Sequence, residues 1–462
     1  MKILDLIRDR QSDQFELHER YLNGQMVRVL KTIGFDKSYV RAEGAYLFDA
    51  QGERYLDLLS GFGVFGIGRN HPSVIETLGE ILHSELPHLV QMDVSLLSGL
   101  LAERLLDKLP GPLEKMFFCN SGTEAVEAAI KFSRCATGRS KIVYCDHAFH
   151  GLTLGSLSLN GDHHFRDGFG PLLPDTVQIP FDDLPALEQA LQERDVAAFI
   201  VEPIQGHGVA IPSDDYLPEA ARLCREAGSL FVADEVQTGL GRTGRFSAVD
   251  HWGVEPDMLL MAKALSGGFV PVGAVACRRS IFDAVFNRLD RAVVHGSTFS
   301  KNNLAMAAGL AVIDVIESEG LIENAARVGA DIVSELQPMR DEWEFVKDVR
   351  GKGMMIALEF GKPTSLPLRT AWKLLETANE GLFCQMITVP LFTRHRCLSQ
   401  VAGHGMQVVK FIPPLTLTDD DRRWIVDGVR DVVADAHTFP GSIWDLGKTL
   451  AGQALKMKAG SN

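Results

Sequence analysis

Five short clusters of small and polar residues each follow an apolar run, and their residue types are suited to chemistry. The clusters are Asn120–Ala125, Ala148–Gly151, Glu202–Gly206, Asp234–Gly239 and Ala262–Gly268. If the apolar runs are strands of an open α/β sheet, ligands bind beyond the carboxyl ends of those strands. We therefore expect the five clusters to meet at one edge of the sheet.

Lys263 and Asp234 are the chemically most informative of these residues. Lys263 follows the apolar run Met258–Met261 almost directly and precedes a series of small residues, which is unusual for a surface lysine. A buried lysine has a depressed pKa and forms Schiff bases with carbonyl compounds. Asp234 and Glu235 end another apolar run, where carboxylates suit a metal ion or a protonated ring nitrogen.

Two more clusters suit a flat, phosphorylated ligand. Ser121, Gly122 and Thr123 precede a helical pattern, and the backbone N–H groups of a helix N-terminus bind anions. Ser121 and Glu124 also have the spacing of a capping box, which an ordinary capped helix shares. Phe149 is placed to stack on a ring. A phosphate cradle, an aromatic lid, a carboxylate for a ring nitrogen and a lysine together describe pyridoxal phosphate.

A metal centre explains these residues less well. Cys145, His147 and His150 lie close in sequence, but no second pair completes a zinc ligand set. A magnesium enzyme would use the carboxylates and the lysine, yet it would leave Phe149 and the glycines after Lys263 unexplained. We expect no metal.

The middle of the chain alternates strands with helices. We expect strands at 115–119, 141–144, 197–201, 230–233 and 258–261, and helices at 123–137 and 218–227. Buried apolar strands that alternate with helices indicate an α/β fold with a mostly parallel sheet covered on both faces.

The two ends of the chain have a different pattern. Residues 39–60 predict a meander with a turn at 50–52, and residues 320–440 mix helices with short strands such as 354–359. We expect a large domain over 76–325. The N-terminal segment 1–75 and the C-terminal segment 326–462 would together form a smaller α+β domain.

Composition limits the partners. The chain has 462 residues, a net charge of −14 and 46% hydrophobic residues. The acidic excess repels nucleic acid, which is therefore not an expected partner. The sequence lacks a run of 18 apolar residues, so we expect no membrane-spanning segment. Seven scattered cysteines without a CxxC pair indicate reduced thiols and a cytoplasmic enzyme.

At these residues the sequence resembles the class III pyridoxal-phosphate-dependent aminotransferases, which have the type I aminotransferase fold. The resemblance covers roughly residues 40–435 and rests on an ordered set of motifs. These are Ser121–Lys131, Phe149–Gly151, Glu202–Gly206, Asp234–Gly244, the segment around Lys263, His295–Phe299 and Pro413–Leu415.

The resemblance implies roles for the residues that hold the cofactor ring. Lys263 would bind pyridoxal phosphate covalently and then move the proton between substrate and cofactor. Asp234 would keep the pyridine nitrogen protonated, and Gln237 would bond the phenolic oxygen. Val236 and Phe149 would press on opposite faces of the ring.

It also implies roles for the remaining site residues. Ser121, Gly122 and Thr123 would hold the phosphate, with His150 and Glu202 also at the cofactor and Glu202 facing the substrate. Phe65, in the segment Ser60–Gly66, would form part of the substrate wall. Thr298 would reach the phosphate of the neighbouring subunit, which implies a homodimer with shared active sites.

The chain departs from the family at Lys410. The family usually has an arginine here, which clamps a substrate carboxylate, whereas lysine is a point charge and cannot form a planar clamp. 2-Oxoglutarate or pyruvate would then be bound less tightly by Lys410, or it would be bound by another basic residue such as Arg394 or Arg396. The stretch between Gly381 and Lys410 is also longer than usual in the family, and it is either a cover over the substrate mouth or a solvated insertion.

The substrate is an amino donor with a carbonyl acceptor, and the resemblance offers two classes. Val90–Leu97 and Val294–Asn302 resemble bacterial aminotransferases of hopanoid biosynthesis, which aminate the terminal aldehyde of a hopanoid side chain to give aminobacteriohopanetriol. Gly61–Phe65 and Arg350–Met354 resemble putrescine-type aminotransferases, which take a terminal amine with 2-oxoglutarate or pyruvate. Of these two classes, the sequence favours the hopanoid interpretation.

One set of apolar residues bears on this choice. A lipid-like substrate would suit Val64, Phe65, Ile67, Leu89 and Val90, and so would an ordinary dimer interface. Pyridoxal-phosphate aminomutases share the cofactor residues and stay as a further alternative.

Overall fold

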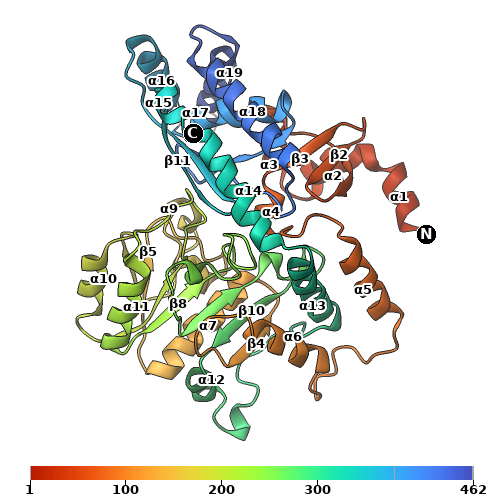
Figure 1. Cartoon of the computed structure of the whole chain (residues 1–462), viewed down its shortest axis with the longest axis vertical. Helices are drawn as coiled ribbons and strands as arrows, with labels where there is room; N and C mark the ends of the chain where they lie inside the picture. The colour runs from red at the N-terminus through yellow and green to blue at the C-terminus, as the bar shows by residue number, and fades with distance from the viewer. Residues whose placement is uncertain (1, 379, 460–462) are drawn as a thin grey trace.

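The computed structural model describes residues 2–378 and 380–459. A seven-stranded sheet with the order β4-β10-β9-β8-β7-β5-β6 forms its centre (Figure 1). The strands are β4 (Lys115–Cys119), β5 (Lys141–Cys145), β6 (Thr176–Ile179), β7 (Val196–Val201), β8 (Leu230–Asp234), β9 (Met258–Met261) and β10 (Gly273–Cys277).

The predicted mostly parallel sheet is confirmed. The neighbouring pairs from β6 through β5, β7 and β8 to β9 are parallel, whereas β10 runs antiparallel to both β9 and β4. Every residue of β7, β9 and β10 is buried, as expected for strands covered on both faces. Strands β6 and β10 were not predicted from the sequence.

Two apolar cores lie on the two faces of this sheet. Along β7, Phe199 and Val201 belong to one core, while Ala198 and Ile200 belong to the other, because successive side chains of a strand point to opposite faces. The helices that accompany the sheet are α5 (Pro72–His83), α6 (Leu96–Leu106), α7 (Gly122–Thr137), α8 (Leu154–Leu157), α9 (His163–Arg166), α10 (Leu184–Leu191), α11 (Tyr216–Ala227), α12 (Arg279–Val285) and α13 (Asn303–Ser318).

The two ends of the chain meet in one small sheet. Its strands are β1 (Tyr39–Glu43), β2 (Tyr46–Asp49), β3 (Arg54–Asp57) and β13 (Cys397–Leu398), and β13 pairs in parallel with β3. A second small sheet contains β11 (Val346–Lys352), β12 (Met355–Phe360), β15 (Val408–Phe411) and β14 (Gln400–Val401). The domain boundaries at 75 and 325 stay predictions.

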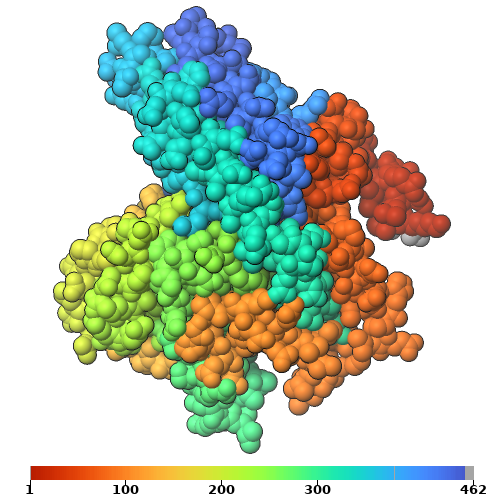
Figure 2. All heavy atoms as spheres, viewed as in Figure 1, coloured from red at the N-terminus to blue at the C-terminus, as the bar shows by residue number. Residues whose placement is uncertain are grey.

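Helices complete the two ends. The N-terminal helices are α1 (Ile3–Asp9), α2 (Gln14–Tyr21), α3 (Gly24–Ile33) and the single turn α4 (Ser60–Gly63); the C-terminal ones are α14 (Leu321–Leu336), α15 (Met339–Glu342), α16 (Leu366–Ala378), α17 (Leu382–Thr393), α18 (Asp419–His437) and α19 (Ser442–Ala459). In Figure 2 the N-terminal segment, drawn in red, projects from the side of the molecule. Among the described residues, no helix is both long and apolar enough to span a bilayer.

Helix α17 corrects both sequence-based interpretations for the first part of the stretch between Gly381 and Lys410. It is neither a cover nor a solvated insertion, because it is a largely buried helix, whereas Gly403 further along the stretch lies close to His207. Phe392 of α17 stacks on Tyr55 with ring centroids 5.1 Å apart, which packs this helix against the N-terminal strands. Helix α17 therefore belongs to the apolar core of the chain ends.

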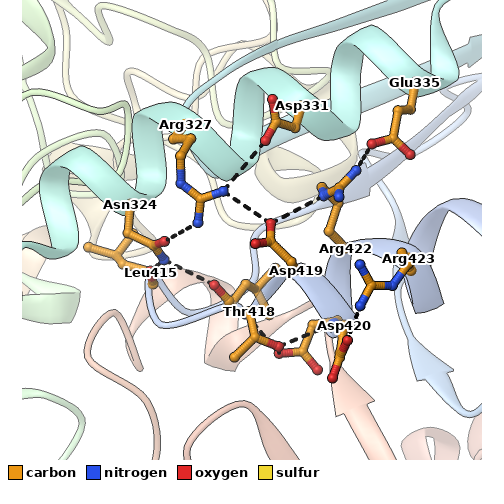
Figure 3. A network of polar contacts seen from close by, with 12 residues as sticks. Asn324, Arg327, Asp331, Glu335, Leu415, Thr418, Asp419, Asp420, Arg422 and Arg423 are labelled. Carbon is orange, nitrogen blue, oxygen red and sulfur yellow. Dashed lines mark hydrogen bonds and ion pairs between the residues drawn. The ribbon is translucent and has the colours of Figure 1, made fainter.

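Polar contacts between α14 and α18 fix the chain that follows β15 (Figure 3). Asn324 Nδ2 donates to the carbonyl oxygens of Leu415 (2.7 Å) and Leu417 (3.0 Å), and Arg327 pairs with Asp419 at 3.0 Å. The Leu415 N–H in turn donates to the Gly66 carbonyl at 2.7 Å. These bonds hold the segment after Lys410 against the N-terminal part of the chain.

Candidate active site

A cavity of about 370 Å³ lies where the strands of the large sheet end. The segments that follow β4, β5, β8 and β9 all contribute to its lining, as the sequence analysis expected of that edge. Its lining includes eight predicted site residues: Ser121, Gly122, Thr123, Phe149, His150, Asp234, Val236 and Lys263.

The N-terminus of α7 forms one end of the cavity. Ser121 Oγ accepts the N–H of Glu124 at 3.3 Å, and Glu124 Oε2 accepts the N–H of Asn120 at 2.6 Å. The first N–H groups of a helix have no partner within the helix and attract anions. A Cβ at Gly122 would stand 2.8 Å from Val236 Cγ1, so the close approach of these segments requires glycine there.

A hydroxyl network that the sequence analysis missed supports this end of the cavity. The Thr123 hydroxyl contacts Thr153 Oγ1 at 2.7 Å and Ser156 Oγ at 2.6 Å. Thr153 Oγ1 donates to Glu127 Oε1 at 2.6 Å, and the N–H of Gly155 reaches the same oxygen at 2.9 Å. Glu127 therefore holds the side chain of Thr123 through Thr153.

Asp234 and His150 form a buried pair on the cavity floor. His150 Nδ1 lies 2.7 Å from Asp234 Oδ2, and Asp234 Oδ1 accepts the N–H of Val236 at 3.0 Å. Burial alone would lower the pKa of His150, but its hydrogen bond to Asp234 and the charge of that carboxylate outweigh burial and raise this pKa. These two bonds fix the Asp234 carboxyl group at the cavity lining.

The neighbouring carboxylate of Glu235 points elsewhere. It accepts the N–H groups of Ala248 (2.8 Å) and Val249 (2.9 Å) and the hydroxyl of Thr238 (2.8 Å). Burial raises the pKa of Glu235 to about 7. Only Asp234 of the two adjacent carboxylates therefore serves the cavity, and Glu235 stabilises the loop behind it.

Glu202 lies between Phe149, which lines the cavity, and Gly206, which also bonds to Lys410. Its Oε1 accepts the N–H of Phe149 at 2.9 Å, and its Oε2 accepts the N–H of Gly206 at 2.8 Å. Burial raises the pKa of Glu202, and the charge of Asp234 adds to this effect against the opposing influence of His150.

Lys263 begins a short 3-10 turn directly after β9. Its φ of +41° lies in the left-handed region, which is strained for a residue with a side chain and is often found at functional sites. Burial lowers the pKa of its amine, while Asp234 and Glu202 oppose that shift. The amine makes no hydrogen bond or ion pair with any described residue, so it is available to a ligand.

Two buried polar atoms near the floor also lack partners among the described residues. They are Gln237 Oε1 and His150 Nε2. Gln237 is held by its Nε2, which donates to the Phe62 carbonyl at 3.0 Å. A buried polar atom without a partner is costly unless a ligand or water satisfies it.

His207, which was not predicted from the sequence, lies beside Phe149, and we call His207 and the nearby Lys410 the mouth. The ring centroid of His207 lies 5.5 Å from that of Phe149 and 5.9 Å from that of Phe165. Burial and the charge of Lys410 lower the pKa of His207 to about 4, so its ring is neutral near pH 7. A single histidine in a glycine-rich loop gives no periodic pattern from which its place at the site could be predicted.

Lys410 lies beside this wall in the centre of β15. Its side chain is buried, and its Nζ donates to the Gly206 carbonyl at 2.7 Å. Through Gly206 it adjoins Glu202, so the structure brings two predicted substrate residues together.

Six predicted site residues do not line the cavity: Glu202, Gln237 and Lys410, which are described above, and Phe65, Thr298 and Arg394. Phe65 packs against Gly268 and beneath the guanidinium of Arg69. Thr298 lines a separate groove beyond α7. Arg394 is ion-paired with Asp431 and Asp435 of α18, which corrects its interpretation as a substrate residue because both carboxylates already neutralise it. Arg396 likewise pairs with Glu53.

The apolar wall predicted for a lipid-like substrate is also divided. Val64 lines the cavity, whereas Ile67 is buried in the main core. Leu89 and Val90 line the same separate groove as Thr298. These side chains do not form one continuous surface.

The residues of the cavity fit pyridoxal phosphate. A lysine amine without a partner, a fixed aspartate side chain, an anion-binding helix end and unpartnered atoms at Gln237 and His150 match its aldehyde, ring nitrogen, phosphate and remaining polar groups. The fold and site thus define a pyridoxal-phosphate enzyme built on a mostly parallel α/β sheet.

The family model Aminotransferase class-III matches residues 34–433, and the chain belongs to this family. Aminotransferase PigE of a Serratia species is 34% identical over 92% of this chain, which spans only 54% of that longer protein. Acetylornithine aminotransferase of Bacillus cereus is 36% identical over 86% of this chain and 94% of its own length. Putrescine aminotransferase of Pectobacterium atrosepticum is 36% identical over 84% of this chain and 80% of its own.

Solved structures agree with this assignment. Ornithine aminotransferase of Toxoplasma gondii superposes with a TM-score of 0.81 at 29% identity, covering 94% of this chain and 98% of its own. A pyridoxal-phosphate-bound amine transaminase from an uncultivated Pseudomonas species gives 0.74 at 30% identity, with 87% and 96% covered. The expected fold, cofactor and aminotransferase class are confirmed.

Proposed function

We propose that this aminotransferase exchanges an amino group between a terminal primary amine and a keto acid. The observation that carries this proposal is the charge distribution at the mouth. Lys410 is the cation beside Glu202 and the neutral ring of His207, and Arg394 is neutralised elsewhere. The mouth thus offers one carboxylate site for a keto acid and uncharged aromatic walls for a donor that lacks an α-carboxylate.

The residues of the floor would perform the chemistry. Pyridoxal phosphate, when bound, supplies an electron-accepting ring that stabilises the charge left on a deprotonated substrate carbon. The N-terminus of α7 and Thr123 would hold the phosphate, and Asp234 would keep the ring nitrogen protonated. The Lys263 amine would hold the aldehyde carbon and then carry a proton between substrate and cofactor.

Named relatives support the terminal-amine class. Putrescine, acetylornithine and ornithine appear in the names of proteins that this chain resembles. An aldehyde on a hopanoid side chain is the other terminal acceptor that the sequence predicts, and it stays a prediction. The division of its apolar wall between core, cavity and groove makes us place the diamine class first.

A half-reaction screen tests the proposal. The cofactor absorbance of the holoenzyme is followed after addition of putrescine, ornithine, glutamate, alanine or a long-chain amine, each without acceptor. We expect complete spectral conversion with at least one terminal amine, and restoration by 2-oxoglutarate or pyruvate. Conversion only with glutamate or alanine, which have no terminal amine, would contradict the proposal, and turnover without any acceptor would favour an aminomutase.

We also propose that the enzyme works as a homodimer. A groove of about 1550 Å³ is lined by residues from 86–102 and 282–303, and Thr298 lies within it. Val94 and Val293 line this groove and are 90% and 91% exposed, an apolar surface that a second copy would cover. Asn120 Nδ2 donates to Ser297 Oγ at 2.6 Å, which couples the cavity edge to the loop that carries Thr298.

Oligomeric state and activity test this second proposal together. Val293→Asp is expected to produce monomers by sedimentation velocity and to lower turnover at least about tenfold, because Thr298 would no longer reach a partner's phosphate. Leu4→Asp, on the exposed helix α1, is the control and should leave both unchanged. A fully active Val293→Asp monomer would rule out the shared site.

A further inference from the structure

Lys410 is a buried lysine with one hydrogen-bond partner. It stands in the middle of β15, opposite Ala357 of β12 and Gln400 of β14, and its side chain is 3% exposed. Its Nζ donates only to the carbonyl of Gly206, at 2.7 Å. A protonated amine has three donors, so two of them lack a partner among the described residues.

The surroundings of Lys410 are largely apolar. Val408 and Lys410 point to the same face of β15, since alternate residues of a strand share a face. On that face Val408 packs in an apolar cluster with Ile204, Val209, Met355, Ala357 and Ala402. Such an environment penalises the charged form of a lysine.

The nearest charged groups do not compensate this penalty. Glu202 attracts the ammonium, but both its carboxylate oxygens are already bonded to the N–H groups of Phe149 and Gly206. Lys263 repels the ammonium, and His207 stays neutral.

The other elements packed against β15 do not help either. Glu359 of β12 pairs with Arg350 at 2.6 Å, and burial keeps the Cys384 thiol of α17 neutral. No carboxylate of the described residues forms an ion pair with Lys410. Burial first, and the charge of Lys263 second, lower the pKa of Lys410 to about 7, against the opposing influence of Glu202.

We propose that Lys410 binds the keto-acid carboxylate as an ammonium and is neutral when the amine donor occupies the site, so that each acceptor takes up one proton as it binds. The proton comes from solvent and adds to the free amine, and the ammonium then meets the carboxylate. This rests on the proposed function, in which the acceptor is a keto acid and the donor is a terminal amine.

A switch of this kind suits two substrates of opposite charge. An arginine stays charged in both half-reactions, and its charge must be moved or screened when the second substrate carries no carboxylate. A buried lysine that titrates near neutral pH can lose its charge without moving. The substrate carboxylate itself supplies the counter-charge that raises the lysine pKa again.

Calorimetry with glutarate, a dicarboxylate that has no keto group and cannot react, tests the proposal. Holoenzyme is titrated between pH 6 and 9 in pairs of buffers with different ionisation enthalpies, which reports the protons taken up. For the wild type we expect close to one proton per glutarate at pH 8 to 9, falling toward zero at pH 6. Glutarate affinity should fall about tenfold per pH unit above pH 7 to 8.

Three variants make the outcome specific. Lys410→Arg, which stays charged, should bind glutarate with no proton uptake from Lys410 and with little pH dependence. Lys410→Met should bind at least about tenfold more weakly at pH 6.5. Lys347→Met removes an exposed lysine and should match the wild type. Circular dichroism confirms that each variant is folded.

Two results would overturn the proposal. One is proton uptake in Lys410→Arg equal to that of the wild type, and the other is undiminished glutarate binding by a folded Lys410→Met variant. The amine half-reaction is measured separately on the same wild-type samples. If no terminal amine converts the cofactor although glutarate binding still takes up a proton, the donor class of the proposed function is refuted. The role of Lys410 would then stand.

Discussion

The floor and the mouth of the cavity differ in how firmly their charges are held. On the floor, Asp234 is bonded to His150 and to the backbone of Val236, and Glu202 is bonded to two backbone N–H groups. At the mouth, Lys410 has a single bond to a carbonyl and His207 lies between aromatic rings.

This difference matches two different tasks. The floor must hold one cofactor in one orientation through every turnover, and groups fixed before binding cost little reorganisation. The mouth must accept two substrates in turn, so a group whose charge can change is better suited than a fixed ion pair. Substitutions on the floor should therefore abolish chemistry, whereas substitutions at the mouth should change selectivity and pH dependence.

The largest effect is expected at Lys263. Lys263→Ala removes the amine that holds the cofactor and carries the proton, so turnover should fall about 10⁴-fold or more. Single-turnover absorbance with the best amine donor measures this. Lys347→Ala, which removes an exposed lysine outside the cavity and the groove, is the control, and a Lys263→Ala enzyme of near-normal activity would refute the assignment of the floor.

Asp234→Asn should have the next largest effect. The substitution removes the negative charge that keeps a ring nitrogen protonated, and we expect a fall in kcat of about 10²- to 10³-fold. Because Asp234 also raises the pKa of His150, NMR of labelled histidine should show that pKa falling in the variant. An unchanged His150 pKa would mean that the two side chains do not interact.

The pH dependence of stability distinguishes the mouth from the floor. The folded pKa of Lys410 is about 7, well below that of an unfolded lysine near 10.4, so between these values the unfolded chain binds more protons. The wild-type free energy of unfolding should therefore gain about 1.4 kcal/mol per pH unit in this window from Lys410 alone.

A matched variant isolates this contribution. Lys410→Met lacks the titrating group, so its stability relative to the wild type should be greatest near pH 7 and decline toward pH 9 in urea unfolding. Lys347→Met is the control, because it removes an exposed lysine and leaves Lys410 in place. A constant difference between Lys410→Met and the wild type across this range would contradict a depressed Lys410 pKa.

The smallest effect is expected at Arg394. Its ion pairs with Asp431 and Asp435 are partly exposed, and exposed pairs contribute about 0.2–1 kcal/mol each. Arg394→Ala should therefore cost at most about 2 kcal/mol and leave the apparent affinity for 2-oxoglutarate unchanged. A tenfold loss of that affinity would return Arg394 to the substrate site.

The sequence predicted the site best where a chemically distinctive residue directly follows an apolar run. The apolar runs before Asn120, Asp234 and Lys263 predicted both the strands and the edge at which their following residues meet. Strand β10 gave no such signal, because Gly273–Cys277 carries no chemical group at its end and its antiparallel direction depends on pairing with β4 and β9. Helix α17 was missed because Pro390 and the polar segment after it resemble a loop.

The residues of the mouth were harder to predict for a different reason. The contacts of His207 with Phe149 and Phe165 join segments that are distant in sequence, and no periodic pattern encodes them. Arg394 carries the charge expected of an anion site, but it pairs with Asp431 and Asp435 on α18, the next helix along the chain. Residue type alone does not reveal which charges are already neutralised.

Transfer of labelled nitrogen tests directly whether the enzyme moves an amino group from a terminal amine to a keto acid. Holoenzyme is given ¹⁵N-putrescine and unlabelled 2-oxoglutarate or pyruvate, and the amino acids formed are analysed by mass spectrometry. The account predicts ¹⁵N-glutamate or ¹⁵N-alanine in amounts equal to the diamine consumed, and no product without a keto acid. Label that never reaches a keto acid, although the cofactor is bound and other donors react, would contradict it.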